Sequence, residues 1–141
     1  MTDPFDLEAL VTRVIDHGFH IHCDLGPGLL ESVYEAVLAA SLQRVGIAVE
    51  RQKLVDIHYD GMTLRDGLRI DLLIEDRLIV ELKSVERLAP VHRKQVLTYL
   101  RLTGRSLGLL MNFGAVSYRD GVRRIANNHD DSAYRARLAN P

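Results

Sequence analysis

Residues 69–84 constrain the fold more than any other part of this chain. Aliphatic side chains dominate two runs, 69–74 and 78–84, and three polar residues, Glu75 to Arg77, separate them. Short runs rich in branched aliphatic residues on either side of a polar stretch predict two antiparallel strands joined by a tight turn. Because strand side chains alternate between the two faces of a sheet, the register of this hairpin decides which residues meet.

A three-residue turn brings the charged side chains of this hairpin together. In that register Asp71 lies directly opposite Glu81, and Lys83 shares their face. A two-residue turn would instead put the two carboxylates on opposite faces. The other face is wholly apolar and is expected in the core; it consists of Ile70, Leu72, Ile74, Leu78, Val80 and Leu82.

Two adjacent carboxylates on a half-buried strand pair need compensation, because buried charges are costly and like charges repel. A divalent cation is one solution, since carboxylate, water and phosphate oxygens suit Mg²⁺ or Mn²⁺. Lys83 beside them could then orient or activate a water molecule. The alternative is a partly exposed salt bridge of Lys83 with Asp71 or Glu81, which contributes little to stability. Spacing alone leaves both interpretations open.

The rest of the chain alternates between helical and strand periodicity. Three segments have the apolar spacing of helices, namely about 6–25, 29–45 and 90–103. Four further segments are typical of strands, namely 49–59, 107–112, 116–119 and 122–126. Asp120-Gly121 is expected to join the last two strands as a hairpin. With the last hairpin counted as a single unit, the order α-α-β-β-β-α-β-β predicts one α/β domain over residues 1–128, followed by a polar tail, 129–141.

The composition fits a single soluble domain. The chain has 141 residues, of which 47% are hydrophobic and 26% are charged, so one core of ordinary size is expected. The single cysteine, Cys23, excludes an internal disulfide and a multi-cysteine metal site. An acidic start and the lack of a long apolar stretch argue against a secretory signal and a membrane span, which predicts a cytoplasmic protein.

A net charge of −1 hides an uneven distribution. Residues 1–50 carry 2 basic and 8 acidic side chains, residues 51–105 carry 11 and 8, and residues 106–141 carry 5 and 3. The near-neutral total therefore permits a weakly basic face without predicting one.

The helix predicted over 90–103 carries a polar set on one face. His92, Gln95 and Tyr99 are spaced three and four residues apart, so they lie on the same side of the helix. We expect this side to look onto the charged end of the hairpin, with Gln95 holding a water or a phosphate oxygen. The alternative is an ordinary helix in which Tyr99 is half-buried and His92 caps the first turn.

Glu31 and the histidines before it are weaker candidates. Glu31 lies in the first turn of a predicted helix, where the helix dipole favours a carboxylate in any case, so a third metal-ligand role and a purely helical role are both open. His17, His20 and His22 lack the paired spacing of a zinc finger. Surface or boundary positions on the first helix are expected for them, with His22 near the active site.

Three motifs carry a family resemblance. Asp71, followed after nine residues by Glu81-Leu82-Lys83, resembles the motif of the PD-(D/E)XK nuclease superfamily, although Ile70 stands where a proline often precedes the aspartate. Gln95-Val-Leu-Thr-Tyr99 resembles the QxxxY motif of its RecB-like branch. Gly28-Leu-Leu-Glu31-Ser-Val-Tyr34 is similar to the signature of the GxxExxY protein family, a bacterial group within that superfamily.

The resemblance implies a restriction-endonuclease-like fold, with a central mixed sheet flanked by helices. It implies that Asp71 and Glu81 bind Mg²⁺ or Mn²⁺ and that Lys83 is the catalytic lysine. Gln95, Tyr99 and Glu31 are expected to complete the site, with Glu31 as the candidate third metal ligand. The implied reaction is hydrolysis of phosphodiester bonds in nucleic acid, with DNA favoured over RNA.

Nucleic acid is accordingly the expected partner. The cations expected to contact its phosphates are Arg69, His92, Arg93 and Lys94, with Arg51, Lys53, Arg87, Arg101 and Arg105 as further candidates. The alternatives on the same fold are a non-catalytic nucleic-acid-binding module and a homo-oligomeric regulatory component. The intact set of Asp, Glu and Lys favours the enzyme.

Overall fold

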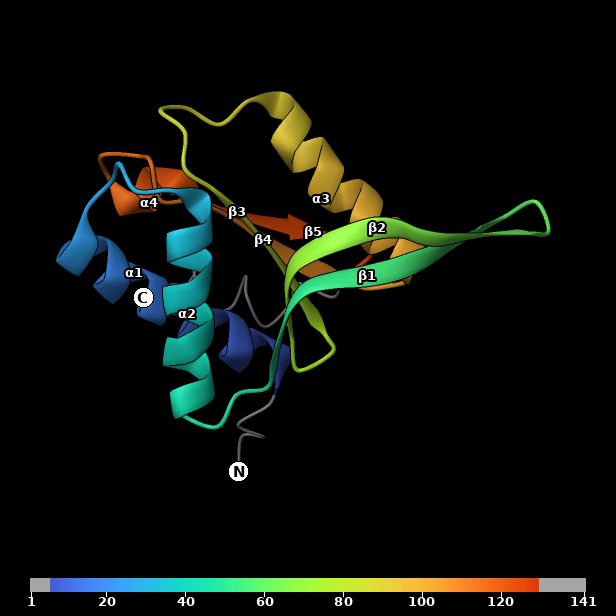
Figure 1. Cartoon of the computed structure of the whole chain (residues 1–141), viewed down its shortest axis with the longest axis horizontal. Helices are drawn as coiled ribbons and strands as arrows, with labels where there is room; N and C mark the ends of the chain where they lie inside the picture. Colours follow the sequence, from blue (N-terminus) through green and yellow to red (C-terminus); the bar gives the residue numbers. More distant parts are fainter. Residues whose placement is uncertain (1–5, 130–141) are drawn as a thin grey trace.

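The computed structural model describes residues 6–129, which form a mixed five-stranded sheet with helices on both faces (Figure 1). The elements are α1 (Leu7–Leu25), α2 (Glu31–Arg44), β1 (Val49–Tyr59), β2 (Met62–Ile74), β3 (Leu78–Lys83), α3 (Pro90–Thr103), β4 (Leu107–Asn112), α4 (Tyr118–Gly121) and β5 (Val122–Ala126). The strand order is β1-β2-β3-β4-β5, with only β3 and β4 parallel among these pairs. The predicted fold class is confirmed.

Two apolar layers sandwich the sheet. One buried cluster lies between α1, α2 and the sheet, and the other lies between α3 and the opposite face. The outer half of the β1–β2 hairpin extends away from both layers (Figure 1). Since β3 and β4 are covered on both sides, almost all of their side chains are buried.

The β2–β3 hairpin has the predicted register. Ile74 pairs with Leu78, and Leu72 pairs with Val80, so the turn contains three residues. Four residues predicted to be buried, Ile70, Leu72, Val80 and Leu82, each have 0% exposure. The hairpin therefore brings its charged residues to one place, as the sequence predicts.

The predicted face of Ile70 is wrong. Ile70 packs with the cluster beneath α3, whereas Leu72 packs with the cluster beneath α1 and α2. The β1–β2 ladder is interrupted between these residues, where Asp71 faces Gln52, and Gln52 has a φ of 51° in the left-handed region. The regular alternation of side chains is broken there.

Two predicted strands have different bounds. β2 begins at Met62 instead of residue 69, because residues 62–68 pair with β1 across the Asp60-Gly61 turn. The predicted strand over 116–119 and its hairpin are wrong. Tyr118–Gly121 forms the short helix α4, and β5 pairs with β4 instead. The buried Tyr118 hydroxyl donates to Ile15 O at 2.6 Å, which ties this segment to α1.

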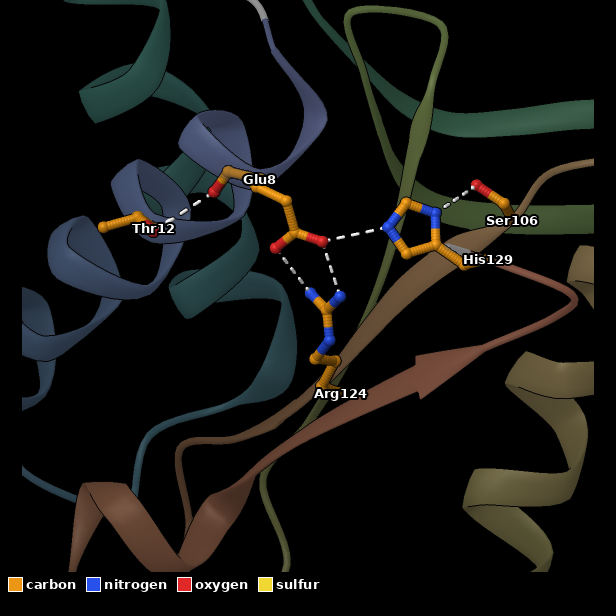
Figure 2. Close-up of polar contacts among 5 residues, drawn as sticks. All are labelled: Glu8, Thr12, Ser106, Arg124 and His129. Carbon is orange, nitrogen blue, oxygen red and sulfur yellow. Dashed lines mark hydrogen bonds and ion pairs between the residues drawn. The ribbon is translucent and has the colours of Figure 1, made fainter. Parts of the chain in front are cut away.

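Figure 2 shows a polar network that joins α1 to β5. Arg124 donates to both oxygens of Glu8, at 2.6 and 3.0 Å, and His129 Nε2 lies 2.9 Å from Glu8 Oε1. Burial raises the pKa of Glu8, but hydrogen bonds and positive charge from Arg124 and His129 outweigh it and hold the pKa below its usual value. Apart from His129, the predicted tail lies outside the described residues.

No helix within residues 6–129 is both long and apolar enough to cross a membrane.

We predict that Glu8→Gln lowers the free energy of unfolding by about 3 kcal/mol at pH 7, because it removes the buried carboxylate that binds both Arg124 and His129. Glu50→Gln is the matched control, since the Glu50–Lys53 pair is largely exposed and contributes under about 1 kcal/mol. Urea unfolding measures both. The carboxylate with the lowered pKa stabilises the fold above its ordinary value of 4.5, so the deficit of Glu8→Gln should shrink in more acidic buffer. Equal effects of the two substitutions would contradict this account.

Candidate active site

An open cavity of about 440 Å³ lies where β2, β3, α2 and α3 meet. Seven of the residues singled out in the sequence line it, namely Glu31, Arg69, Asp71, Glu81, Lys83, Gln95 and Tyr99. The two strands of the central hairpin supply Asp71, Glu81 and Lys83, and the helices on either side of the sheet supply Glu31, Gln95 and Tyr99.

Asp71 and Glu81 lie where the next residue pair of the β2–β3 ladder would be. Beyond the Leu72–Val80 pair, the Asp71 amide donates to Glu81 Oε1 at 3.2 Å, and the Leu82 amide donates to Asp71 Oδ2 at 2.9 Å. Each carboxylate thus accepts a backbone hydrogen bond from the opposite strand. These bonds hold the two acidic side chains close together on one face.

The environment of Glu81 disfavours its charge. The side chain is buried, with the residue 3% exposed, and the neighbouring Asp71 adds a like charge. Burial first, and then Asp71, raise the pKa of Glu81 to about 9, against the opposing effect of Lys83. Burial and the Asp71 charge therefore both favour the protonated form of Glu81 when no cation is bound.

Glu31 comes to this cavity through the first turn of α2. The Tyr34 hydroxyl donates to Gly26 O at 2.5 Å and accepts from the Leu29 amide at 3.1 Å, so it fixes the loop that leads into the helix. Ser84, directly after β3, donates to Leu29 O at 2.6 Å and ties this loop to the end of the strand. Burial raises the pKa of Glu31, and Lys83 opposes that shift.

Hydrogen bonds from residues at the end of β4 fix the end of β3. Phe113 N donates to Lys83 O at 2.9 Å, and the buried Asn112 side chain bonds to both the amide and the carbonyl of Val85, at 3.0 and 2.8 Å. A Cβ on Gly114 would lie 2.3 Å from Val85 O, so only glycine allows this close approach. The backbone at Lys83 and just after it is thereby fixed.

The QxxxY residues of α3 bond to each other. Gln95 Nε2 donates to the Tyr99 hydroxyl at 3.0 Å, one helical turn away. Both side chains are half-buried and line the cavity. Val96 and Leu100 on the same helix pack into the core. The helix therefore presents the polar pair beside the carboxylates, as the spacing predicts.

The remaining predicted residues lie elsewhere. His92 Nδ1 accepts from the Ala89 amide at 3.1 Å and caps the first turn of α3, while Arg93 and Lys94 are exposed on that helix. The surface or boundary position expected for His22 is wrong. It is buried, and its Nε2 lies 2.7 Å from Ala115 O. This contact holds the loop that follows β4.

Sequence reasoning missed Gln52 and Glu35. Gln52 Nε2 donates to the Glu35 carboxylate and, at 3.4 Å, to Asp71 Oδ1. Glu35 is buried, with 5% exposure, and pairs with Arg51 at 3.0 Å. The sequence could have indicated Glu35, because it lies four residues after Glu31 and therefore on the same helical face. Gln52 sits in a strand and carried no signal in the sequence.

The donor set fits a hard divalent cation. Asp71 and Glu81 offer carboxylate oxygens, and a cation would replace the proton that Glu81 otherwise holds. Among the described residues no group of three or more His, Cys, Asp or Glu side chains is arranged to hold a metal ion. Water, phosphate or backbone oxygens would therefore have to complete the coordination.

Comparisons with known proteins agree with this fold. The family model described as "PD-(D/E)XK nuclease superfamily" matches residues 8–125. A solved structure described as "Crystal structure of SSO0001" superposes with a TM-score of 0.51 at 22% identity, covering 77% of this chain and 55% of that one. The likeness shows a common fold, and this chain spans only about half of the length of that protein. No curated protein sequence matches significantly.

The chain belongs to the PD-(D/E)XK nuclease superfamily, because the family model covers most of its length. The superfamily is one of nuclease-like proteins that generally use divalent metal ions.

We predict that Glu81 makes the metal-free protein less stable as the pH rises. The pKa of Glu81 is raised from 4.5 to about 9, so the folded protein favours the protonated side chain. The free energy of unfolding should therefore be highest below pH 4.5 and should fall by roughly 1 kcal/mol per pH unit up to about pH 9. Glu81→Gln should remove this slope and be more stable than wild type at pH 8. Urea unfolding in EDTA between pH 5 and 8 measures it.

The exposed Glu86→Gln is the control and should keep the wild-type slope. A Glu81→Gln protein with an unchanged slope would show that Glu81 is ionised in the folded protein at neutral pH.

Proposed function

We propose that this protein is a metal-dependent nuclease that hydrolyses phosphodiester bonds in nucleic acid, with DNA as its substrate. One observation carries the proposal. Two acidic side chains from adjacent strands contact each other in an open cavity that also contains a lysine two residues beyond the second acid. We further assign the chain to the GxxExxY group and to the RecB-like branch, on its Gly28–Tyr34 and Gln95–Tyr99 motifs.

In this proposal Asp71 and Glu81 hold Mg²⁺ or Mn²⁺, and Glu31 adds a third acidic side chain to the cavity wall, close enough to act on the ion through a bound water. A bound divalent ion polarises a phosphoryl oxygen and makes a coordinated water more acidic. Glu81 would have to be ionised to hold the cation, whose two positive charges would offset both burial and the repulsion from Asp71. The role of the two carboxylates would be to position the ion.

Lys83 acts on the water and on the developing charge. Lys83 lines the same cavity as both acids, and its ammonium group has three donors but no lone pair to offer a metal. It orients the attacking water and stabilises the negative charge that builds on the phosphate oxygens. Gln95 and Tyr99, bonded to each other on the cavity wall, help to hold the water or a phosphate oxygen.

Cations around the cavity would hold the nucleic-acid backbone. Arg69 lines the cavity, and Arg93 and Lys94 are exposed on α3. His92 lies in the first turn of the same helix, where its Nε2 is the ring nitrogen left for a phosphate. Contacts of this kind predict binding that weakens with salt and depends little on sequence.

We predict that Asp71→Asn weakens Mn²⁺ binding at least tenfold, because it removes one of the two charged oxygen ligands from the cavity. Asp76→Asn is the control, since Asp76 forms an exposed pair with Arg105 in the β2–β3 turn. Isothermal titration calorimetry of the folded proteins compares their affinities. Identical Mn²⁺ affinity in wild type and Asp71→Asn would leave the acidic pair with a structural role only.

We predict that Lys83→Ala keeps Mn²⁺ binding and the fold but cuts nucleic-acid cleavage by on the order of a hundredfold. Lys83→Arg should restore activity incompletely, because the planar guanidinium places its charge and donors differently. Cleavage of single- and double-stranded DNA and RNA is assayed with Mg²⁺ and with Mn²⁺. The exposed Arg44→Ala, at the opposite end of α2 from Glu31, serves as the control for loss of charge.

A wild-type protein that binds metal but cleaves none of these substrates would favour a different function. A salt-dependent affinity for the same nucleic acids would then indicate a non-catalytic binding module. A concentration-dependent mass in solution, with no such affinity, would indicate an oligomeric regulatory component.

A further inference from the structure

Gln52 adopts a backbone conformation that is unfavourable for a side chain in a strand. Its φ of 51° lies in the left-handed region, and the β1–β2 ladder lacks the pair that Gln52 would form with Asp71. Such strain persists only where the surroundings enforce it, and it often marks functional sites.

That side chain connects two acidic groups. Gln52 Nε2 donates to the Glu35 carboxylate and to Asp71 Oδ1, with 3.4 Å to the latter. On the far side of Glu35, Arg51 donates two hydrogen bonds to Oε2, at 3.0 and 3.3 Å. Because Glu35 is buried and held by Arg51, it is a fixed acceptor that sets the position of the Gln52 amide.

Asp71 is consequently held through both oxygens. The Leu82 amide fixes Oδ2 at 2.9 Å, and the Gln52 amide approaches Oδ1 from the neighbouring strand. A carboxylate held at both oxygens cannot rotate freely about its last torsion angle, and each oxygen keeps a second acceptor position. Gln52 and Glu35 line an adjacent cavity of about 340 Å³, which shares Glu31 with the cavity of Asp71 but does not contain Asp71 itself. Gln52 therefore approaches Asp71 from outside the cavity that holds the two acids.

We infer that Gln52 is a positioning residue that orients the Asp71 carboxylate toward a divalent cation, and that the buried Glu35 holds Gln52 in place. The inference rests on the proposed metal-dependent function. Hydrogen-bond partners behind a metal ligand commonly change metal affinity by 10- to 100-fold when removed. The strained backbone of Gln52 is explained as the cost of bringing its amide between the two carboxylates.

Gln52→Gly separates positioning from folding. Glycine adopts a φ of 51° without strain, so the variant should unfold at a temperature similar to that of wild type. Its Mn²⁺ affinity, measured by calorimetry, should nevertheless fall about tenfold. Glu35→Gln should weaken Mn²⁺ binding less, and adding it to Gln52→Gly should have little further effect, because Glu35 acts through Gln52. Gln43→Ala, which removes an exposed hydrogen bond to Val49 O, should bind Mn²⁺ as wild type does.

A metal-free measurement tests the same contact. The side-chain amide signal of Gln52 in an NMR spectrum should move in Asp71→Asn and in Glu35→Gln, while the Gln43 signal stays in place. Wild-type Mn²⁺ affinity in Gln52→Gly, or a Gln52 signal that ignores Asp71→Asn, would overturn the inference. A wild-type protein that binds no Mn²⁺ would refute the proposed function, and the NMR result alone would then decide whether Gln52 is coupled to Asp71.

Discussion

The contact between Asp71 and Glu81 is the constraint on which the site depends. Two carboxylates side by side on buried strands oppose folding unless a proton or a cation offsets their repulsion. The protein meets this cost locally, with a backbone amide from the opposite strand for each acid and a raised pKa at Glu81. Apolar residues on both faces of the hairpin supply the burial that keeps the pair in place.

The surrounding elements bring further groups to this pair. The crossover through α3 places Gln95 and Tyr99 over one face of the sheet, and α2 brings Glu31 from the other side. Asn112 and Gly114 fix the chain just after Lys83. A small domain thus positions its polar groups from rigid strands and helices, which is the arrangement that precise chemistry requires.

Local patterns in the sequence predicted the hairpin register and the QxxxY face, because strand alternation and helical spacing depend on neighbouring residues. Long-range contacts left no such pattern. The pairing of β5 with β4 and the attachment of Tyr118 to α1 turned an expected hairpin into the helix α4. Gln52 reaches Asp71 only because β1 lies beside β2, and the Glu8–Arg124 pair joins residues at opposite ends of the described chain.

Anomalous diffraction at the manganese edge tests the central claim most directly. In crystals grown with MnCl₂, we expect one strong peak within about 2.5 Å of an oxygen from both Asp71 and Glu81. The peak should be absent in crystals of Glu81→Gln. A manganese ion bound only at other acidic or histidine side chains, with the Asp71–Glu81 contact intact and empty, would contradict the account.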